Sequence, residues 1–208
     1  MIKDESVDTL LDTLASQSAT PGGGSAAAIM GAMGAALVSM VCNLTIGKRN
    51  YSDVELEMKD VLGRADALRR CLTEMIHDDV QVFERVMGAY SLPRQTDAQK
   101  SLRSDAIQTA LKEATLVPLA CARASREVME LAEIVAGKGN RSVISDAGVA
   151  VLAAHAALCS AALNVRINAG NIDDALFVKS QLAELKDIMR GADRLQATVC
   201  GLVRTKFN

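Results

Sequence analysis

The sequence predicts an all-α, single-domain bundle of about six helices around a buried central helix rich in alanine and glycine. Its 208 residues include 33 alanines but only three prolines and 2% aromatic residues, which favours close-packed helices over sheets. Hydrophobic residues make up 50% and charged residues 23%, a balance typical of one globular domain, here spanning residues 1–208. An almost unbroken apolar run at 26–42 predicts the central helix.

Clusters of glycine, proline and polar residues divide the chain into the expected helices. Each helix begins near a side chain that can cap its first turn. Pro118 should interrupt the fourth helix with a kink, because proline lacks an amide donor and clashes with the preceding turn. The six expected helices cover residues 6–16, 25–45, 53–90, 97–136, 145–169 and 173–206.

Charge and hydropathy argue against two classes of partner. The formal net charge is −2, so the overall field does not attract nucleic acid or an anionic membrane. The run at 26–42 approaches the length of a membrane span, but it consists mainly of Ala, Gly and Met, contains Ser39, and has no comparable partner in the sequence. The acidic start of the chain does not resemble a secretion signal. We therefore expect a cytoplasmic protein that binds neither nucleic acid nor membrane.

Cysteine and histidine spacing offers little for metal or nucleophilic chemistry. The five cysteines occur singly, without a C-x-x-C pair, and are expected to be reduced packing residues. The Glu-x-x-His spacing of di-iron bundles occurs once, at Glu74 and His77, so the second half of a dimetal site is missing and we predict no metal. We find no cysteine or serine placed beside a histidine in a nucleophile motif.

Asp79 lies on the apolar stripe of the third expected helix. It follows Ile76 by three residues and precedes Phe83 by four, which is the spacing of one helix face. A carboxyl group on a buried face is costly unless it is hydrogen-bonded or paired, and loss of solvent raises its pKa. Such groups often act as acids or bases, so Asp79 is a catalytic candidate. The alternative is structural: Asp79 caps or pairs with another helix.

One stripe of the fifth expected helix is small in the middle and polar at both ends. Asp146 lies at its start and Asn164 and Asn168 at its end, with alanines between them. The two asparagines offer donors and acceptors one turn apart, and the alanines allow a helix or a flat ligand to come close. Interhelical hydrogen bonds and tight packing explain the same stripe equally well.

The glycine run Gly22, Gly23 and Gly24, followed by Ser25, leads into the buried second helix. Its free amides and the positive end of the helix dipole favour an anion or a carbonyl oxygen, although a flexible turn would also explain the glycines.

At the other end of the second helix, two cations, Lys48 and Arg49, come just before Tyr51. Complementing the negative C-terminal end of the helix is an adequate explanation for one of these cations.

Together these segments resemble the formiminotetrahydrofolate cyclodeaminase and methenyltetrahydrofolate cyclohydrolase family over nearly the whole chain. Among the members, the sequence is most similar to the stand-alone cyclohydrolases of methylotrophic bacteria. One departure is Val82 before Phe83, where the family often has alanine. The matching stretches are 20–25, 34–41, 45–51, Asp79 with Phe83, 92–96, 117–119, 139–140, 145–146, Asn164 and 167–168.

The resemblance implies a homodimer that hydrolyses 5,10-methenyltetrahydrofolate to 10-formyltetrahydrofolate, without a cofactor beyond the folate itself. Asp79 and Asp146 are then expected to meet in one cleft, Asp79 as base or electrostatic partner and Asp146 as the second carboxylate, and Lys48 to donate a proton or anchor the charged tail. The remaining expected substrate contacts are Gly22, Gly23, Gly24, Ser25, Tyr51, Asn140, Asn164 and Asn168.

Two other functions stay open. The first is the cyclodeaminase reaction, in which the same ring closes with loss of ammonia; a chain of 208 residues has no room for the formiminotransferase domain of the bifunctional proteins. The second is a non-catalytic helical dimerisation module, in which buried Asp and Asn residues only fix the helix register.

Overall fold

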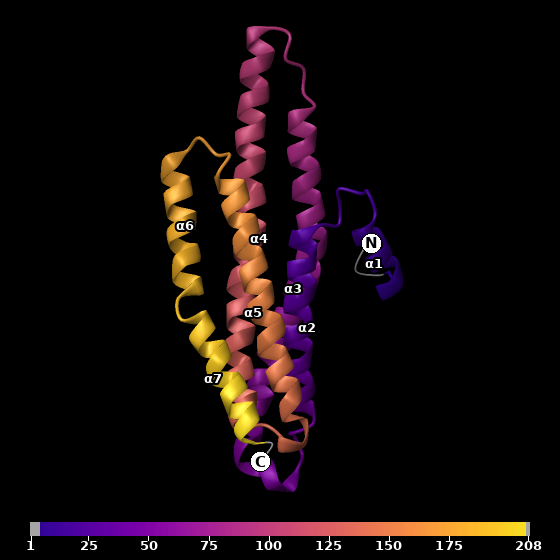
Figure 1. The fold of residues 1–208 in the computed structure, drawn as a ribbon, viewed down its shortest axis with the longest axis vertical. Coiled ribbons are helices and arrows are strands. Elements are labelled where there is room, and N and C mark those ends of the chain that lie inside the picture. Colours follow the sequence, from indigo (N-terminus) through magenta and orange to yellow (C-terminus); the bar gives the residue numbers. More distant parts are fainter. Residues whose placement is uncertain (1–4, 207–208) are drawn as a thin grey trace.

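The protein, described by a computed structural model over residues 5–206, is a bundle of long helices (Figure 1). Helices α2 to α5 form its core: α2 packs on α3 and α5, and α4 packs on α3 and α5, so the four make a closed square. The helices are α1 (Val7–Ala15), α2 (Gly23–Asn43), α3 (Glu55–Tyr90), α4 (Asp97–Lys138), α5 (Ile144–Ala169), α6 (Ala175–Met189) and α7 (Ala192–Thr205), with 3-10 turns η2 (Arg49–Val54) and η3 (Arg141–Val143).

Small residues let α2 and α5 approach closely in the core. A Cβ on Gly34 would lie 3.0 Å from the carbonyl oxygen of Ala150, so a larger residue would push the two helices apart. Ala35 and Ala154 are both completely buried. The apolar run at 26–42 therefore lies in α2, one of the four core helices, whose inner side is buried and whose outer side is exposed.

Several expected boundaries differ from the observed ones. The last expected helix is two helices, α6 and α7, because Gly191 adopts a left-handed conformation with φ +70° between them. Pro118 lies inside the fourth helix without ending it, since α4 runs from Asp97 to Lys138. Helix α2 begins at Gly23, so Ser25 lies inside its first turn rather than capping it.

Helices α3 and α4 extend well past the other core helices (Figure 1). Phe83 and Met87, which periodicity placed on the buried stripe, lie in this extension and are 36% and 52% exposed. Val82, beside them, is buried instead. The apolar stripe of α3 continues in the sequence past Asp79. Helix α2 begins level with Asp79, however, so it does not cover the part of α3 that follows Asp79.

An apolar surface follows the outer side of α2 and α5. By length and composition, both α2 and the segment 141–169 could cross a membrane, and 56% and 50% of their most apolar windows are buried in the bundle. The expectation that 26–42 has no comparable partner is therefore wrong. Leu152 and Leu163 of α5 are exposed. We call the exposed apolar set the α2–α5 face: Met33, Met40, Leu44, Val149, Leu152, Leu163 and Ile167.

Candidate functional site

Asp79 of α3 lies against the first turn of α2. The Ser25 hydroxyl, which is fully buried, donates to Asp79 Oδ2 at 2.8 Å, and the Ser25 backbone N–H also donates to the carboxyl group. The first N–H groups of a helix have no partner within the helix, and here a carboxyl group from another helix satisfies one of them. The structural role considered for Asp79 is thus present: it caps α2.

Gly24 is required for this contact. A Cβ at position 24 would lie 2.0 Å from Asp79 Oδ1, closer than any side chain can come. A Cβ on Gly23 would instead lie 3.9 Å from Asn164 Nδ2, an ordinary contact distance. The structure therefore brings Asp79, Gly23, Gly24, Ser25 and Asn164 together, and we call this group the carboxyl half-site. The sequence predicted an anion or a carbonyl oxygen beside the glycine run, and the group that lies there is the carboxyl group of Asp79.

Burial raises the pKa of Asp79 above its ordinary value, because loss of solvent disfavours the charged form. The two hydrogen bonds from Ser25 act in the opposite direction without cancelling this effect. A carboxyl group in this state can exchange a proton nearer to neutral pH than an exposed aspartate can.

A cavity of about 10 Å³ lies beside Asp79, with Gly24, Pro118, Cys121 and Ala161 in its wall. This volume suits one water molecule and excludes a folate ring, which must approach from outside. The Cys121 thiol is not a nucleophile there: burial raises its pKa to about 12, and the charge of Asp79 contributes in the same direction.

The two asparagines of α5 have different roles. Asn168 Nδ2 donates to the Ala114 carbonyl oxygen at 2.7 Å. That carbonyl would normally accept from the N–H of residue 118, which is proline and has none, so Asn168 replaces the missing helical bond. Asn164 Nδ2 donates to Ser160 of its own helix at 3.0 Å, and Asn164 borders Gly23. The side-chain donor of Asn168 is thus used in an interhelical hydrogen bond. Asn164 lies beside Gly23 in the carboxyl half-site.

Lys48, Tyr51 and Asn140 lie together at the far end of α2, around a cavity of about 350 Å³ that Arg49 also lines. Asn140 Nδ2 donates to the Leu44 carbonyl oxygen at 2.7 Å, at the C-terminus of α2. The side chain of Asn140 is thus used in joining two segments. We call Lys48, Arg49, Tyr51 and Asn140 the cationic half-site.

The rest of this region is also held by hydrogen bonds between side chain and backbone. The Arg141 backbone N–H donates to the Tyr51 hydroxyl at 3.0 Å, and the Asn140 side-chain oxygen accepts from the Ser142 N–H at 3.0 Å. Within residues 5–206, the cations Lys48 and Arg49 have no ion-pair partner. The cavity therefore has two available positive charges.

Within one chain, the expectation that Asp79 and Asp146 share a cleft is wrong. Asp146 is in the first turn of α5, next to the cationic half-site, whereas Asp79 lies at the level of Asn164. Asp146 and Asn164 are eighteen residues apart in α5, which corresponds to a rise of about 27 Å along the helix. Groups that act on one carbon atom must lie within about 3–3.5 Å of their partners. Helical spacing shows that two residues share a stripe, but not that they share a site.

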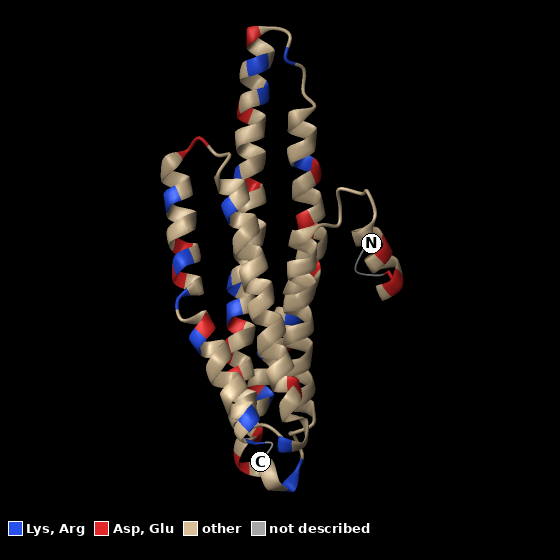
Figure 2. Ribbon diagram, in the orientation of Figure 1, with Lys and Arg blue, Asp and Glu red and all other residues tan. Residues whose placement is uncertain are grey.

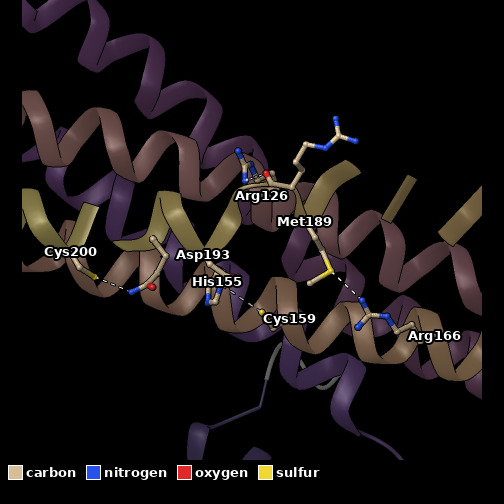
Figure 3. Close-up of polar contacts among 9 residues, drawn as sticks. Arg126, His155, Cys159, Arg166, Met189, Asp193 and Cys200 are labelled. Atoms are coloured by element: carbon tan, nitrogen blue, oxygen red, sulfur yellow. Dashed lines mark hydrogen bonds and ion pairs between the residues drawn. The ribbon is translucent and has the colours of Figure 1, made fainter. Parts of the chain in front are cut away.

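The structure also places a cysteine beside a histidine, which sequence motifs did not suggest (Figure 3). Cys159 Sγ is 3.8 Å from His155 Nε2, and Asp193 Oδ1 is 2.8 Å from the same nitrogen. A catalytic relay needs both ring nitrogens, and here both contacts use one. Burial, with the charge of Asp193, raises the pKa of Cys159, so the group is not an activated nucleophile. In the same view Arg166 Nη2 approaches Met189 Sδ at 3.7 Å.

Sequence reasoning missed Pro118 and Cys121 as neighbours of Asp79. A proline inside a helix leaves the carbonyl four residues earlier unpaired, so a donor facing Ala114 could have been sought in the sequence. Cys121 carries no comparable signal. No three His, Cys, Asp or Glu side chains of the described part of the chain are grouped to hold a metal ion.

Comparison with known proteins gives one family. The family model for formiminotransferase-cyclodeaminase matches residues 6–187. Methenyltetrahydrofolate cyclohydrolase of Methylorubrum extorquens is 58% identical over 208 residues, covering all of both chains. Formimidoyltransferase-cyclodeaminase of Rattus norvegicus is 30% identical over 203 residues, which are 98% of this chain and 38% of that protein.

A solved structure has the same fold. The crystal structure of formiminotetrahydrofolate cyclodeaminase from Thermotoga maritima superposes with a TM-score of 0.89 at 30% identity, covering 100% of both chains. The similarity thus includes the whole bundle.

Proposed function

Because this chain belongs to the formiminotransferase-cyclodeaminase family, we propose that it hydrolyses 5,10-methenyltetrahydrofolate to 10-formyltetrahydrofolate, reversibly, in one-carbon metabolism. Identity to a cyclohydrolase over the full length of both chains supports this reaction over ring closure with loss of ammonia. The structural observation that carries it is the partly buried Asp79 carboxyl group, with its raised pKa, beside a cavity the size of one water molecule.

The chemistry suits such a group. The one-carbon bridge of the substrate is an amidinium-like cation, which a carboxylate stabilises by charge. Asp79 takes a proton from water as the water oxygen bonds to the bridge carbon. The bond from that carbon to N5 then breaks, its electron pair stays on N5, and N5 receives a proton. The hydroxyl oxygen on the carbon becomes the carbonyl oxygen of the formyl group and its proton is released to solvent, so one H⁺ is produced overall. The nitrogen N10 keeps the formyl group.

The other predicted site residues divide between binding and support. Gly23 and Asn164, which adjoin each other in the carboxyl half-site, would contact the pterin together with the preceding Gly22. Within one chain Lys48 lies too far from Asp79 to donate the proton to the reacting centre, so it would hold the charged tail, with Tyr51 shaping the same cavity; it would donate the proton only if another chain brings it to the carboxyl half-site.

Asn140, Asn168 and Ser25 act mainly by fixing the backbone and Asp79, because their side-chain donors are already used within the protein. Asp146 would serve the reaction as the second carboxylate only if another chain brings it to the carboxyl half-site.

The α2–α5 face supports a homodimer. Seven large apolar side chains are exposed along two neighbouring helices, and contiguous exposed apolar surface marks an interaction site. The enzyme would work as a soluble cytoplasmic dimer, with no partner nucleic acid or membrane and no cofactor beyond the folate.

Cyclodeaminase activity is the second candidate, favoured by the similarity to the Thermotoga maritima cyclodeaminase. Release of ammonia from formiminotetrahydrofolate at a rate exceeding methenyl hydrolysis would replace the first proposal. Folded protein without either activity would instead favour a dimerisation module.

The test is replacement of Asp79 by Asn, which keeps the shape but removes the basicity. We expect hydrolysis of the methenyl chromophore, followed by absorbance, to fall by about 10²–10⁴-fold. Asp78→Asn is the matched control, because Asp78 is exposed on the neighbouring position and should retain activity. Unchanged hydrolysis in Asp79→Asn would remove this carboxyl group from the mechanism.

A further inference from the structure

A cavity of about 540 Å³ lies between α5 and α6, apart from both half-sites. The residues in its wall are Arg166, Leu182, Leu185, Lys186, Met189 and Arg190. Half of these residues are basic, half are apolar, and none is acidic. Cavities of roughly 300–1,000 Å³ with an apolar wall and a few polar groups are typical of small-molecule sites. We call this cavity the α5–α6 groove.

Arg166 reaches across the α5–α6 groove. It belongs to the last turn of α5, where a cation can complement the negative end of the helix. Its guanidinium group instead extends to α6, where Nη2 lies 3.7 Å from Met189 Sδ (Figure 3). A thioether sulfur is a weak acceptor, whereas a guanidinium group has five N–H donors. Within residues 5–206 Arg166 has no carboxylate partner, so most of its donors remain available to an anion in the groove.

The two cations of α6 add to this charge. Lys186 has no ion-pair partner in the described part of the chain, and Arg190, one turn later, is paired with Asp187. Glu184, on the same stretch of α6, is paired with Arg123 of α4. Figure 2 shows basic residues on α6 and on the neighbouring end of α5. Three positive charges in the wall, with one balanced by Asp187, therefore leave an excess of two.

The apolar and basic residues of α6 are arranged in order along the groove. Leu182 lies one helical turn before Lys186 and two turns before Arg190, and Leu185 is buried beneath the groove. The groove thus has an apolar end and a cationic end. It suits an elongated ligand with a flat apolar group at one end and at least two negative charges at the other.

We propose that the α5–α6 groove binds a nucleoside di- or triphosphate. The base lies against Leu182 and Leu185, and the phosphates lie between Arg166, Lys186 and Arg190. Phosphate oxygens accept paired hydrogen bonds from a guanidinium group, and a lysine adds a point charge. Arg166 is rotated by about 200° around α5 from Asn164 of the carboxyl half-site, so the nucleotide and a folate occupy different sides of this helix.

Isothermal titration of the full chain with ADP tests the proposal. We expect one ADP per chain with a Kd below about 1 mM. Arg166→Met and Lys186→Met remove one charge each at exposed positions and keep the unbranched stem, and each should raise Kd by about tenfold. Circular dichroism and thermal melts show whether the variants keep the fold.

Lys179→Met is the matched control. Lys179 is an exposed cation of α6 outside the wall of the groove, so the same loss of charge should change Kd by less than about twofold. No saturable binding of ADP by the folded wild-type chain would overturn the proposal. Equal weakening by Lys179→Met and Lys186→Met would also overturn it, because attraction by net charge alone would explain that result.

Three further titrations test the nature of the ligand. Leu182→Ala should weaken ADP by about fivefold and leave inorganic pyrophosphate unchanged, because only ADP has a base to contact Leu182. Tri-γ-glutamate binding more tightly than ADP would overturn the nucleotide assignment in favour of a carboxylate chain. Saturating folic acid should leave the Kd of ADP unchanged, and competition would overturn the proposal of a separate site. These measurements require no hydrolytic activity, so failure of the proposed function leaves them informative.

Discussion

The two ends of α2 differ in how their unpaired backbone groups are satisfied. At the N-terminus, the Ser25 N–H is bonded by Asp79, an ionisable side chain from another helix. At the C-terminus, the Leu44 carbonyl oxygen accepts from Asn140, a neutral amide that also accepts from the Ser142 N–H. Both ends are capped by residues distant in sequence, but only the first cap can gain or lose a proton.

This difference separates reactive from supporting residues. Asp79 is held by the scaffold and has a raised pKa, so one side chain both caps a helix and can exchange protons. Asn140 fixes the segment that carries Lys48 and Tyr51 without any change of charge. A substitution at the first end should change the chemistry, and one at the second should change mainly stability.

Among substitutions that compare how the two ends of α2 are capped, the largest effect is expected for Gly24→Ala. The added methyl group overlaps the Asp79 carboxyl group, so Asp79 must move and α2 must shift. We expect hydrolysis to fall by about 100-fold and the free energy of unfolding to fall by about 1–3 kcal/mol. Gly63→Ala is the matched control, because an added Cβ at this position of α3 meets nothing within 4 Å and Gly63 belongs to neither half-site. Equal effects of the two substitutions in rate assays and thermal melts would contradict this reading of Gly24.

A smaller effect is expected at the other end, for Asn140→Ala. The Leu44 carbonyl oxygen and the Ser142 N–H both lose a partner, which should lower the free energy of unfolding by about 2 kcal/mol and Tm by about 4–8 °C. Differential scanning calorimetry measures the change. Asn43→Ala, at an exposed position of α2, should leave Tm nearly unchanged, and a Tm of Asn140→Ala equal to that of Asn43→Ala would refute the capping role.

The smallest effect is a pH dependence confined to the Asp79 end. The pKa of Asp79 is raised in the folded protein above its ordinary value of 3.8, so the folded state keeps a proton that the unfolded chain loses. The stability that this provides is present below the ordinary pKa and is lost as pH rises through the folded pKa. Catalysis needs the carboxylate, so the rate should rise over that same interval.

Urea unfolding and rate measurements across pH 4–8 check both trends. Asp79→Asn should remove the pH-dependent part of the stability, while the penalty of Asn140→Ala should stay constant with pH because an amide does not titrate there. Rate and stability of the wild-type protein rising together with pH over this range would contradict the assignment to Asp79.

The helical class and most helix positions could be predicted from the sequence, because they depend on local pattern. Composition and the apolar run predicted α2, and Ser6 and Thr96 cap their helices as capping preference suggests. Asp79 was found from its place on an apolar stripe. Its raised pKa fits the proposed chemistry, and its hydrogen bond with Ser25 fits the structural alternative. Gly191 could have been recognised as a break but was not.

The sequence by itself determined which residues share a helix face, because the helical repeat is a local property. Only the tertiary structure decided what each face meets. It placed Asp146 at the opposite end from Asp79, set the Asp79 carboxyl group where a Gly24 side chain would be, and paired Asn168 with the carbonyl left free by Pro118. These relations depend on how far one helix extends along another, and the periodicity of a single helix contains no information about that offset.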